Sequence, residues 1–491
     1  MLLDKQVRMG TIQRYCPERL WVQIVRKTPE QTDGTRVNAV MQAIREQLAV
    51  RVLVPGERLP SIRQQAERMD VAKNTIVEAY DRLAADGVIT AKRGSGFYVS
   101  GHLPPLSLAD VGATRDRSID PLWLIRQSLE AETGMLKPGC GWLPPSWLPD
   151  EEIRRTLRRL ARDPKTGLLE YGHPYGHFAL REQLGRRLGE RGVAASVRQI
   201  ILTDSGTQAI DLICRFLLES GDTVLIDDPG YFNFQALLRA HRVQLVAVPY
   251  TEQGPDVQTM AELLAQHKPR LYLTNTVFHN PTGAVLSPIV AHRVLKLAED
   301  HDLLIVEDDI YAEFGHNTSP LLASFDGLNR VIHVGSFSKV LSASARCGYL
   351  AVRQDWAEKI VDLKLATTLS SSGLGAELVY SMLRQGAYRH HVEALRTRLA
   401  DIMGRTLHRL EKLGITPWMK PQGGMFLWVR LPDGLDSARV SREALKEGVV
   451  LAPGNVFSLS QTTAPYLRFN VAQCQSPKIF EVLEKAMKKA G

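Results

Sequence analysis

The sequence predicts an α/β fold in which a mostly parallel sheet, covered by helices on both faces, follows a smaller module near the N-terminus. From about residue 137 onward, continuous apolar runs alternate with longer helical patterns. Continuous rather than alternating apolar strands are typical of parallel sheets that are buried on both faces. Residues 37–99 differ from this pattern, because they are compact, helical at first and then strand-like. No period of 20–50 residues repeats, which argues against a solenoid or a propeller.

The predicted strands of the large region are short and apolar. They are QIILTD from Gln199, DTVLIDD from Asp222, RLYLTN from Arg270, LLIVEDD from Leu303 and RVIHVG from Arg330. Helical patterns lie between them, for example over residues 207–218 and 288–300.

The composition sets broad limits on the class of protein. A length of 491 residues suggests two to four domains. The shares of hydrophobic residues, 44%, and charged residues, 23%, are ordinary for a globular protein. No stretch approaches the length of a transmembrane helix, and the first 35 residues lack the apolar core of a secretory signal. The net charge of +8 permits a nucleic-acid partner without demanding one.

Cysteine usage bears on the compartment and on metal binding. The five cysteines are scattered and form no CxxC pair. This pattern predicts neither a disulfide framework nor a metal site, and it favours a reducing cytoplasm.

Differences in composition and in hydrophobic pattern divide the chain into four segments. We expect an N-terminal extension over residues 1–35, a compact module over 36–100, a linker over 101–136 and a large region over 137–491. The linker is rich in proline and has one helical pattern at 122–130. Within the large region we expect a large subdomain over about 180–365 and a smaller α+β subdomain over about 366–491 that includes residues 137–179.

The compact module has the pattern of a helix-turn-helix followed by a wing. Helical patterns cover residues 38–49, a stretch that opens at Ser61, and residues 72–85. Ser61 with Gln64 three residues later predicts a capping box. Two helices joined by the short turn at 69–71 make a helix-turn-helix, and VITAKRGSGFYV predicts two strands around a tight turn.

Several polar side chains of this module are candidates for contact with double-stranded DNA. Lys73, Asn74 and Thr75 begin the third helix, where Asn and Lys can address base edges and Thr a phosphate or a methyl group. Other residues would contact the phosphate backbone: Arg58, Ser61, Arg63, and Lys92 or Arg93. The alternative is a small helical interaction domain whose charged side chains are merely solvated.

The motifs of this module resemble those of the GntR winged-helix family. They are G-x-x-L-P-S-x-R from Gly56, L-x-x-x-G from Leu83 and G-S-G-x-x-V from Gly94. The resemblance implies a winged helix-turn-helix that binds an operator. Lys73 stands where that family usually has arginine, so no operator preference is carried over.

The stretch GSFSKVLSASARCGYL, which follows a predicted strand, gathers reactive and anion-binding side chains. Ser336 and Ser338 precede Lys339, and Arg346 lies seven residues further on. An amine near hydroxyls and a guanidinium suits pyridoxal 5′-phosphate, which is both an aldehyde and a phosphate. Such a cofactor also needs a carboxylate for its ring nitrogen and a flat partner for its ring.

The required partners can be found elsewhere in the sequence. Asp308 ends a buried strand and would hold the ring nitrogen, with Tyr311 as a donor to the ring 3′-oxygen. The alternative is an acidic loop end exposed to solvent. A glycine-containing helix start would bind the phosphate through Ser205, Gly206, Thr207 and Gln208.

Three further residues complete the predicted site. Asn280 in the sequence NPTG is a second donor to the 3′-oxygen, and Tyr231 could stack on the ring. Each also has an ordinary alternative, a proline turn for the first and a packing aromatic for the second. Arg468, on a short apolar strand, would bind a substrate α-carboxylate. Its alternative is a structural arginine that pairs with a nearby acid.

Together these motifs, in this order, resemble the fold-type I aminotransferases over roughly residues 137–491. The resemblance implies Lys339 as the Schiff-base lysine and the other residues in the roles given above. It also implies that Tyr171 reaches the phosphate of a neighbouring subunit, since such sites lie at a dimer interface.

A GntR-type module, a linker and an aminotransferase-like region form the architecture of the MocR subgroup of regulators. The segment before Val37 is longer than the usual short lead of that subgroup. The resemblance implies a homodimeric transcription regulator, domain-swapped or not, that senses pyridoxal phosphate, an amino acid or an amine through aldimine exchange at Lys339. Two alternatives stay open: a metabolic aminotransferase with an accessory DNA-binding module, and a scaffold that holds the cofactor in neither role.

Overall fold

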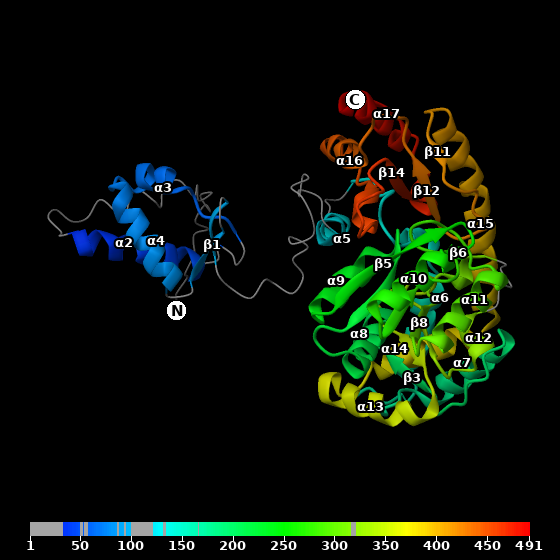
Figure 1. The fold of residues 1–491 in the computed structure, drawn as a ribbon. Helices are drawn as coiled ribbons and strands as arrows, with labels where there is room; N and C mark the ends of the chain where they lie inside the picture. Colours follow the sequence, from blue (N-terminus) through cyan, green and yellow to red (C-terminus); the bar gives the residue numbers. More distant parts are fainter. Residues whose placement is uncertain are drawn as a thin grey trace, which may run out of the picture. The chain divides into compact units, whose positions relative to one another are not determined.

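A computed structural model describes residues 33–49, 53, 57–85, 88–92, 95–99, 121–130, 134–164, 166–315 and 321–491. The chain divides into two compact units, Met1–Ser107 and Leu108–Gly491, which we call the head and the body (Figure 1). Nearly all of the predicted N-terminal extension, residues 1–32, and also Arg93 lie outside the described residues.

The head is a winged helix-turn-helix, as predicted. Its elements are α2 (Asp33–Ala49), α3 (Ile62–Met69), α4 (Lys73–Ala85), β1 (Ile89–Lys92) and β2 (Gly96–Val99). The two strands pair antiparallel, and the main chain at Arg58 and Leu59 runs beside β2. Helix α2 begins five residues before the predicted start at Asn38.

Local hydrogen bonds explain where α3 begins and ends. The Ser61 hydroxyl accepts from the Gln64 amide at 3.3 Å, and the Ser61 amide donates to Gln64 Oε1 at 3.1 Å. This capping box satisfies two amides at the helix start. Asp70 takes the left-handed conformation, with a φ of 50°, and so ends the helix and makes the short turn.

The head has its own apolar core, centred on α4. Ile76, Ala79, Tyr80 and Leu83 are fully buried on one face of this helix. The Tyr80 hydroxyl donates to the Pro60 carbonyl at 3.0 Å, and its ring meets that of Phe97 edge-on. Tyr80 therefore joins the recognition helix to both the segment before α3 and the wing.

The body is built on an eight-stranded sheet in the order β3-β10-β9-β8-β7-β4-β5-β6. The strands are β3 (Ile200–Thr203), β4 (Thr223–Asp228), β5 (Gln244–Thr251), β6 (Gly254–Pro255), β7 (Leu271–Thr274), β8 (Leu304–Asp308), β9 (Val331–Ser336) and β10 (Gly348–Ala351). Strand β10 runs antiparallel to β3 and β9, and β6 runs antiparallel to β5, whereas the other pairs are parallel. All five predicted strands and the mostly parallel sheet are confirmed.

Helices cover both faces of this sheet (Figure 1). The helices of this part are α6 (Asp150–Arg162), α7 (Phe178–Glu190), α8 (Gly206–Leu217), α9 (Phe232–Ala240), α10 (Val257–His267), α11 (Pro288–Asp300), α12 (Leu322–Asp326), α13 (Gln354–Thr368) and α14 (Gly373–Arg384), with short 3₁₀ turns η1 (Pro145–Trp147) and η2 (Ala312–Phe314). Alternate residues of one strand join different apolar clusters: Leu225 packs into one, and Val224 and Ile226 pack into the other. A strand buried on both faces explains the continuous apolar runs of the sequence.

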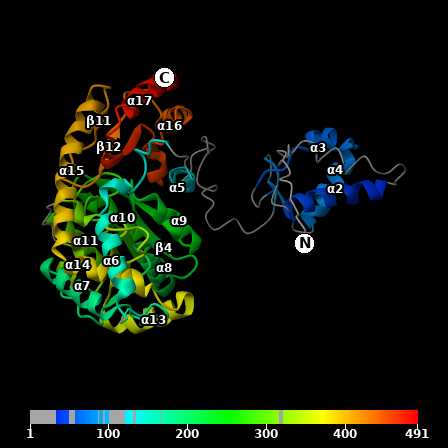
Figure 2. The same cartoon turned by 180° about the vertical axis from the view of Figure 1, so that it is seen from behind.

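A second, four-stranded antiparallel sheet with its helices forms an α+β part of the body, shown in orange and red in Figure 2. Its elements are α15 (Gly386–Glu411), β11 (Thr416–Pro417), β12 (Phe426–Arg430), α16 (Ser437–Lys446), β13 (Ala452–Pro453), η3 (Gly454–Phe457), β14 (Tyr466–Asn470), η4 (Val471–Gln473) and α17 (Lys478–Ala490). The short apolar strand predicted around Arg468 is β14.

The predicted linker contains a helix that belongs to the body. Helix α5 (Pro121–Glu130) packs beside α9. Its Leu124 is buried in a cluster with Phe232, Trp428 and Phe457. Periodicity predicts this helix at 122–130, but its docking on the body depends on residues about 100 to 330 positions away, which the sequence does not reveal.

Among the described helices, none has both the length and the apolar character that crossing a bilayer requires.

Tyr80 gives a test of the head. Tyr80→Phe keeps the buried ring but leaves the Pro60 carbonyl without its donor, which we expect to cost about 1 kcal/mol of local stability. Amide hydrogen exchange of α4, measured by mass spectrometry on the full chain, should then quicken about fivefold. The α11 amides of the body serve as the internal control. Unchanged exchange in α4 would show that this hydrogen bond contributes nothing.

Candidate functional site

The body contains a cavity of about 840 Å³ where the predicted site residues meet. Ten of them line it: Ser205, Gly206, Thr207, Gln208, Tyr231, Asp308, Tyr311, Ser338, Lys339 and Arg346. Three more connect to this lining by hydrogen bonds. Ser336 Oγ lies 2.9 Å from Ser338 Oγ, Asn280 Nδ2 donates to the Tyr311 hydroxyl at 3.3 Å, and Arg468 donates to Asn280.

The parallel sheet explains why these residues converge. Asp308 is the last residue of β8 and Ser336 the last of β9, and the two strands run in the same direction. The carboxyl ends of parallel strands lie at one edge of a sheet, where open α/β folds bind ligands. Strand β10 then returns beside β9, with Gly348 opposite Ser336.

Gly348 holds the lysine turn close to the start of α8. A Cβ atom at this position would lie 2.5 Å from the main-chain carbon of Ser205. Any larger residue would push the two segments apart. The two candidate phosphate-binding segments therefore stay together only because residue 348 lacks a side chain.

Lys339 carries an amine suited to nucleophilic chemistry. Burial lowers its pKa to about 8, because removing the ammonium from water disfavours the charged form. Arg468 lowers the pKa further, whereas Asp308 and Cys140 oppose the shift. A substantial share of the amine is thus neutral near physiological pH, and the neutral form is the nucleophile.

Asp308 is a buried carboxyl whose pKa is raised to about 7, mainly by loss of solvent. One of its oxygens accepts from the Ile310 amide at 3.1 Å, which partly offsets this effect. A cation beside the carboxylate would lower the pKa of Asp308. The site is therefore suited to a ligand that brings a positive charge to Asp308.

Arg468 is a buried arginine held by neutral hydrogen-bond partners. Its Nη1 donates to Asn280 Oδ1 at 2.8 Å and its Nη2 to the Gly139 carbonyl at 2.5 Å. The guanidinium lies over the rings of Phe426 and Phe457, and burial lowers its pKa. Within the described residues no carboxylate pairs with Arg468, and its Nε has no hydrogen-bond partner. The described residues thus give Arg468 no structural ion pair, and a carboxylate ligand would suit this cation.

The start of α8 has the arrangement of an anion-binding turn. Ser205 is the N-cap residue, and its hydroxyl accepts from the Gln208 amide at 3.0 Å. The Gln208 side chain accepts from the Asp204 amide, so it is partly engaged in holding this turn. Thr207 and the exposed Arg346 remain available for an anion, together with the helix dipole.

Sequence reasoning missed Asn275, which organises this edge of the sheet. Its Nδ2 donates to the main-chain oxygen of Asp308 at 2.7 Å, and its Oδ1 accepts from the Asn280 amide at 2.9 Å. Asn275 directly follows the strand RLYLT, so its place at the edge could have been inferred. Its partners could not, because they depend on the side-chain geometry.

Other missed residues line the cavity from segments before the main sheet. They are Ser128, Leu129, Lys137 and Trp142. No local pattern in the sequence marks them. Tyr171, by contrast, was predicted but does not line this cavity: it is 82% exposed, and its reach into a neighbouring subunit stays a prediction.

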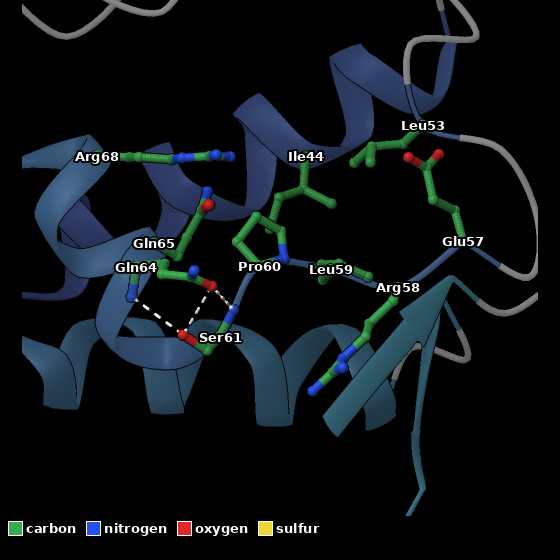
Figure 3. Close-up of a pocket in the computed structure, with 10 residues that line it drawn as sticks. All are labelled: Ile44, Leu53, Glu57, Arg58, Leu59, Pro60, Ser61, Gln64, Gln65 and Arg68. Atoms are coloured by element: carbon green, nitrogen blue, oxygen red, sulfur yellow. Dashed lines mark hydrogen bonds between the residues drawn. The ribbon is translucent and has the colours of Figure 1, made fainter. Parts of the chain in front are cut away.

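In the head, the predicted DNA-contacting residues lie mostly on the surface. Arg58, Ser61 and Arg63 are exposed, as are Lys73 and Asn74 at the start of α4. Figure 3 shows Arg58 and Ser61 on the segment that enters α3, in the wall of a pocket of about 590 Å³. Lys92 of the wing is also exposed and lies 4.9 Å from the centre of the Tyr98 ring.

Thr75 is a correction to the predicted set. Its side chain is only 5% exposed and lies on the same face of α4 as the core residue Ile76. Thr75 therefore does not face outward with Lys73 and Asn74. Val77, one turn after Lys73, is instead 38% exposed and belongs to the outer face.

Comparison with protein families identifies both parts of the chain. Residues 146–485 match the family model described as aminotransferase class I and II. The chain belongs to this family. Residues 36–99 match the family of bacterial regulatory proteins called gntR. The chain thus joins a gntR-type helix-turn-helix to a class I and II aminotransferase domain, as the MocR subgroup does.

Two of the relatives carry the names of transcriptional regulators. The HTH-type transcriptional regulator YdcR of Escherichia coli K12 is 29% identical over 440 residues, which cover 88% of this chain and 94% of that protein. The HTH-type transcriptional regulator NorG of Staphylococcus aureus is 26% identical over 410 residues, which cover 82% of this chain and 92% of that protein.

Enzymes of the aminotransferase family match the body. The 2-aminoadipate transaminase of Thermus thermophilus is 30% identical over 361 residues, 72% of this chain and 89% of that enzyme. The body also resembles a solved structure of LysN, the alpha-aminoadipate aminotransferase of that organism, with 28% identity and a TM-score of 0.68. The aligned part covers 75% of this chain and 95% of the LysN chain. It is complexed with N-(5′-phosphopyridoxyl)-L-leucine.

The lowered pKa of Lys339 can be measured directly. Since the amine is half neutral near pH 8, its acylation rate should reach half of its maximum near that pH in cofactor-free protein. Competitive labelling with acetic anhydride between pH 6 and 11, followed by peptide mass spectrometry, gives this midpoint. N-α-acetyl-lysine added to the same reaction is the comparison, and its midpoint should lie at about 10.4. Equal midpoints would contradict the effect of burial.

Proposed function

We propose that this protein is a DNA-binding transcription regulator that binds pyridoxal 5′-phosphate and senses an amino acid or amine at Lys339. One observation carries the proposal: a winged helix-turn-helix occurs in one chain with a cavity that brings together a half-buried lysine, a buried carboxyl and a buried arginine. The proposal includes the boundaries expected from the sequence, with a DNA-binding domain over 36–100, a linker over 101–136 and a cofactor-binding domain over 137–491.

The side chains around the cavity fit pyridoxal phosphate. Lys339 would bind the aldehyde, Asp308 the ring nitrogen, Asn280 and Tyr311 the 3′-oxygen, and Tyr231 the ring face; Ser205, Gly206, Thr207, Gln208, Ser336, Ser338 and Arg346 would hold the phosphate. The raised pKa of Asp308 agrees with this assignment, because a protonated ring nitrogen supplies the cation that the carboxylate lacks. When bound, the cofactor would withdraw electrons from the α-carbon of an amino acid.

The chain's own groups would then orient the ligand and move protons. Arg468 would bind the α-carboxylate through its free Nε, while Asn280 and the Gly139 carbonyl fix the guanidinium plane. Lys339 Nζ, with a pKa of about 8, could take up and release a proton near neutral pH. The apolar rings of Phe426 and Phe457 exclude water from the arginine.

Regulation requires that the ligand favour one state of the DNA-binding heads over another. A homodimer would present two heads to paired half-sites on the operator. Exposed apolar side chains at Leu168, Leu169 and Tyr171 support such a dimer, in which Tyr171 would reach the phosphate of the partner. We place this regulator in the cytoplasm, where its DNA would be found.

A metabolic aminotransferase is the second candidate. The observation in its favour is that Lys339, Asp308 and a carboxylate-free Arg468 are all present, so no group required for amino transfer is missing. Sustained turnover of an amino acid with 2-oxoglutarate, at about 1 per second or faster, would favour the enzyme over the regulator.

The cofactor assignment is tested by absorption. Purified protein with added pyridoxal phosphate should show a visible band that shifts when sodium borohydride reduces the adduct, and Lys339→Ala should lack this band. Lys359→Ala, which changes an exposed lysine of α13, is the matched control and should keep it. A band of equal strength in Lys339→Ala would refute the assignment.

The DNA assignment is tested by binding to upstream fragments of the protein's own gene. Arg58→Ala, at a predicted phosphate contact, should weaken binding to all sequences and reduce the slope of log affinity against log salt by about 1. Asn74→Ala should cost about 1–3 kcal/mol and relax preference at one base pair.

Lys359→Ala removes one positive charge from the body instead. This variant should change neither the affinity for DNA nor the dependence of that affinity on salt. Binding that does not respond to salt, or that Arg58→Ala leaves intact, would contradict the proposed DNA-binding face.

A further inference from the structure

Helix α5, the first described element of the body, forms part of the wall of the candidate cofactor cavity. Ser128 and Leu129, near its C-terminal end, line the cavity together with Lys339. In the sequence, residues 100–120 connect this helix to β2, the last strand of the head. The helix that receives the chain from the DNA-binding head therefore touches the space where a ligand would lie.

The packing of α5 ties it to the residue that would cover the cofactor ring. Leu124 is 1% exposed and packs against Phe232, in the first turn of α9. Tyr231 immediately precedes that turn, and Phe234 and Leu237 of α9 line the cavity as well. A change in the docking of α5 would therefore alter contacts next to Tyr231.

Polar contacts also connect α5 with the arginine for the ligand carboxylate. Arg468 Nη2 donates to the Gly139 carbonyl at 2.5 Å. Two residues before Gly139, Lys137 Nζ donates to the Ser128 carbonyl of α5 at 3.0 Å. The segment between them is fixed to the small sheet region, because Gly139 donates to the Val450 carbonyl and Val450 donates to that of Leu136. If Arg468 moved on binding a carboxylate, the movement would be transmitted through Gly139 and Lys137. It would thus reach the Ser128 carbonyl at the end of α5.

The exposed side chain of Leu129 indicates which kind of ligand group would cover this wall of the cavity. Leu129 is 67% exposed although it lines the cavity, and the apolar side chains of Trp142, Phe234 and Leu237 line the same cavity. An apolar ligand group placed against these side chains would bury surface that now faces water. A ligand that docks in this way stabilises α5 on the body.

We propose that α5 is the sensing element of this protein, and that the effector is an α-amino acid with an apolar side chain that rests against Leu129. The α-carboxylate binds Arg468, the side chain packs on the α5 wall, and the gain in α5 docking changes the affinity of the protein for DNA. This inference rests on the proposed regulator function and names how its site is coupled to DNA binding.

The first experiment measures α5 itself in the full-length protein loaded with pyridoxal phosphate. We expect 10 mM L-leucine to slow amide exchange over residues 124–129 at least about fivefold, whereas L-aspartate does not. Leu129→Ala and Lys137→Met should lose this protection. Arg126→Ala, on the exposed side of the same helix, is the matched control and should keep it. The cofactor absorption band shows that each variant is folded and loaded.

The second experiment measures coupling to the operator as the ratio of DNA dissociation constants with and without L-leucine. This ratio should differ from 1 by about fivefold or more in the original protein and in Arg126→Ala. It should fall to about 1 in Leu129→Ala.

The outcomes separate the inference from the function on which it rests. If L-leucine changes the cofactor spectrum but not the exchange of α5, or if Leu129→Ala couples as well as the original protein, α5 is not the sensor. If L-aspartate protects α5 and L-leucine does not, the predicted class of effector is wrong. If α5 is protected but no DNA is bound under any condition, the regulator function fails while the ligand contact stands.

Discussion

The candidate site depends on the side chain of Asn275, which holds together the ends of two strands and a turn. Its amide nitrogen binds the main chain at Asp308, its oxygen binds the main chain at Asn280, and its own backbone amide lies 3.4 Å from Asp227 Oδ2. Asn280 in turn contacts Tyr311 and Arg468. The spacing between the carboxyl of Asp308, the 3′-oxygen donors and the carboxylate-binding arginine is therefore set by one amide that touches none of the expected ligand groups.

Buried charge without compensation distinguishes this cavity from an ordinary strand edge. Loss of solvent is the largest cause of the shifted pKa at Lys339, at Asp308 and at Arg468. Isolated buried charges cost several kcal/mol each, so a chain retains them where a ligand completes the set. By contrast, the acids next to Asp308 are satisfied within the protein. Asp309 pairs with Arg191, and Glu307 accepts from Thr276 and from two amides at the start of α12.

The sequence predicts most of this fold because its strands are continuous apolar runs that end in polar residues. Strand ends in a parallel sheet share one edge, so Asp308, Asn280 and Ser336 could be brought together by reasoning alone. Thr75 was placed wrongly because a polar residue at a helix start was assumed to face outward, whereas the period of α4 turns it toward the core. Leu129 and Lys137 could not be found, because their role depends on how α5 docks on segments distant in the chain. For Asn275, the sequence predicts a position at the edge of the sheet, but it does not reveal the hydrogen bonds that the side chain makes.

The burial of Thr75 has a consequence for how the head can approach a duplex. With Thr75 turned inward, the outer face of α4 carries Lys73, Asn74 and Val77 at its start, and the acids Glu78 and Asp81 further along. Glu78 is joined to Arg82 at 2.5 Å, but Asp81 would face the phosphates if the helix lay flat along the groove. Repulsion of this carboxylate therefore favours a steep entry, in which only the first turn of the helix reaches the bases. A helix that enters end-on contacts few base pairs, so one such head by itself would discriminate little between sequences.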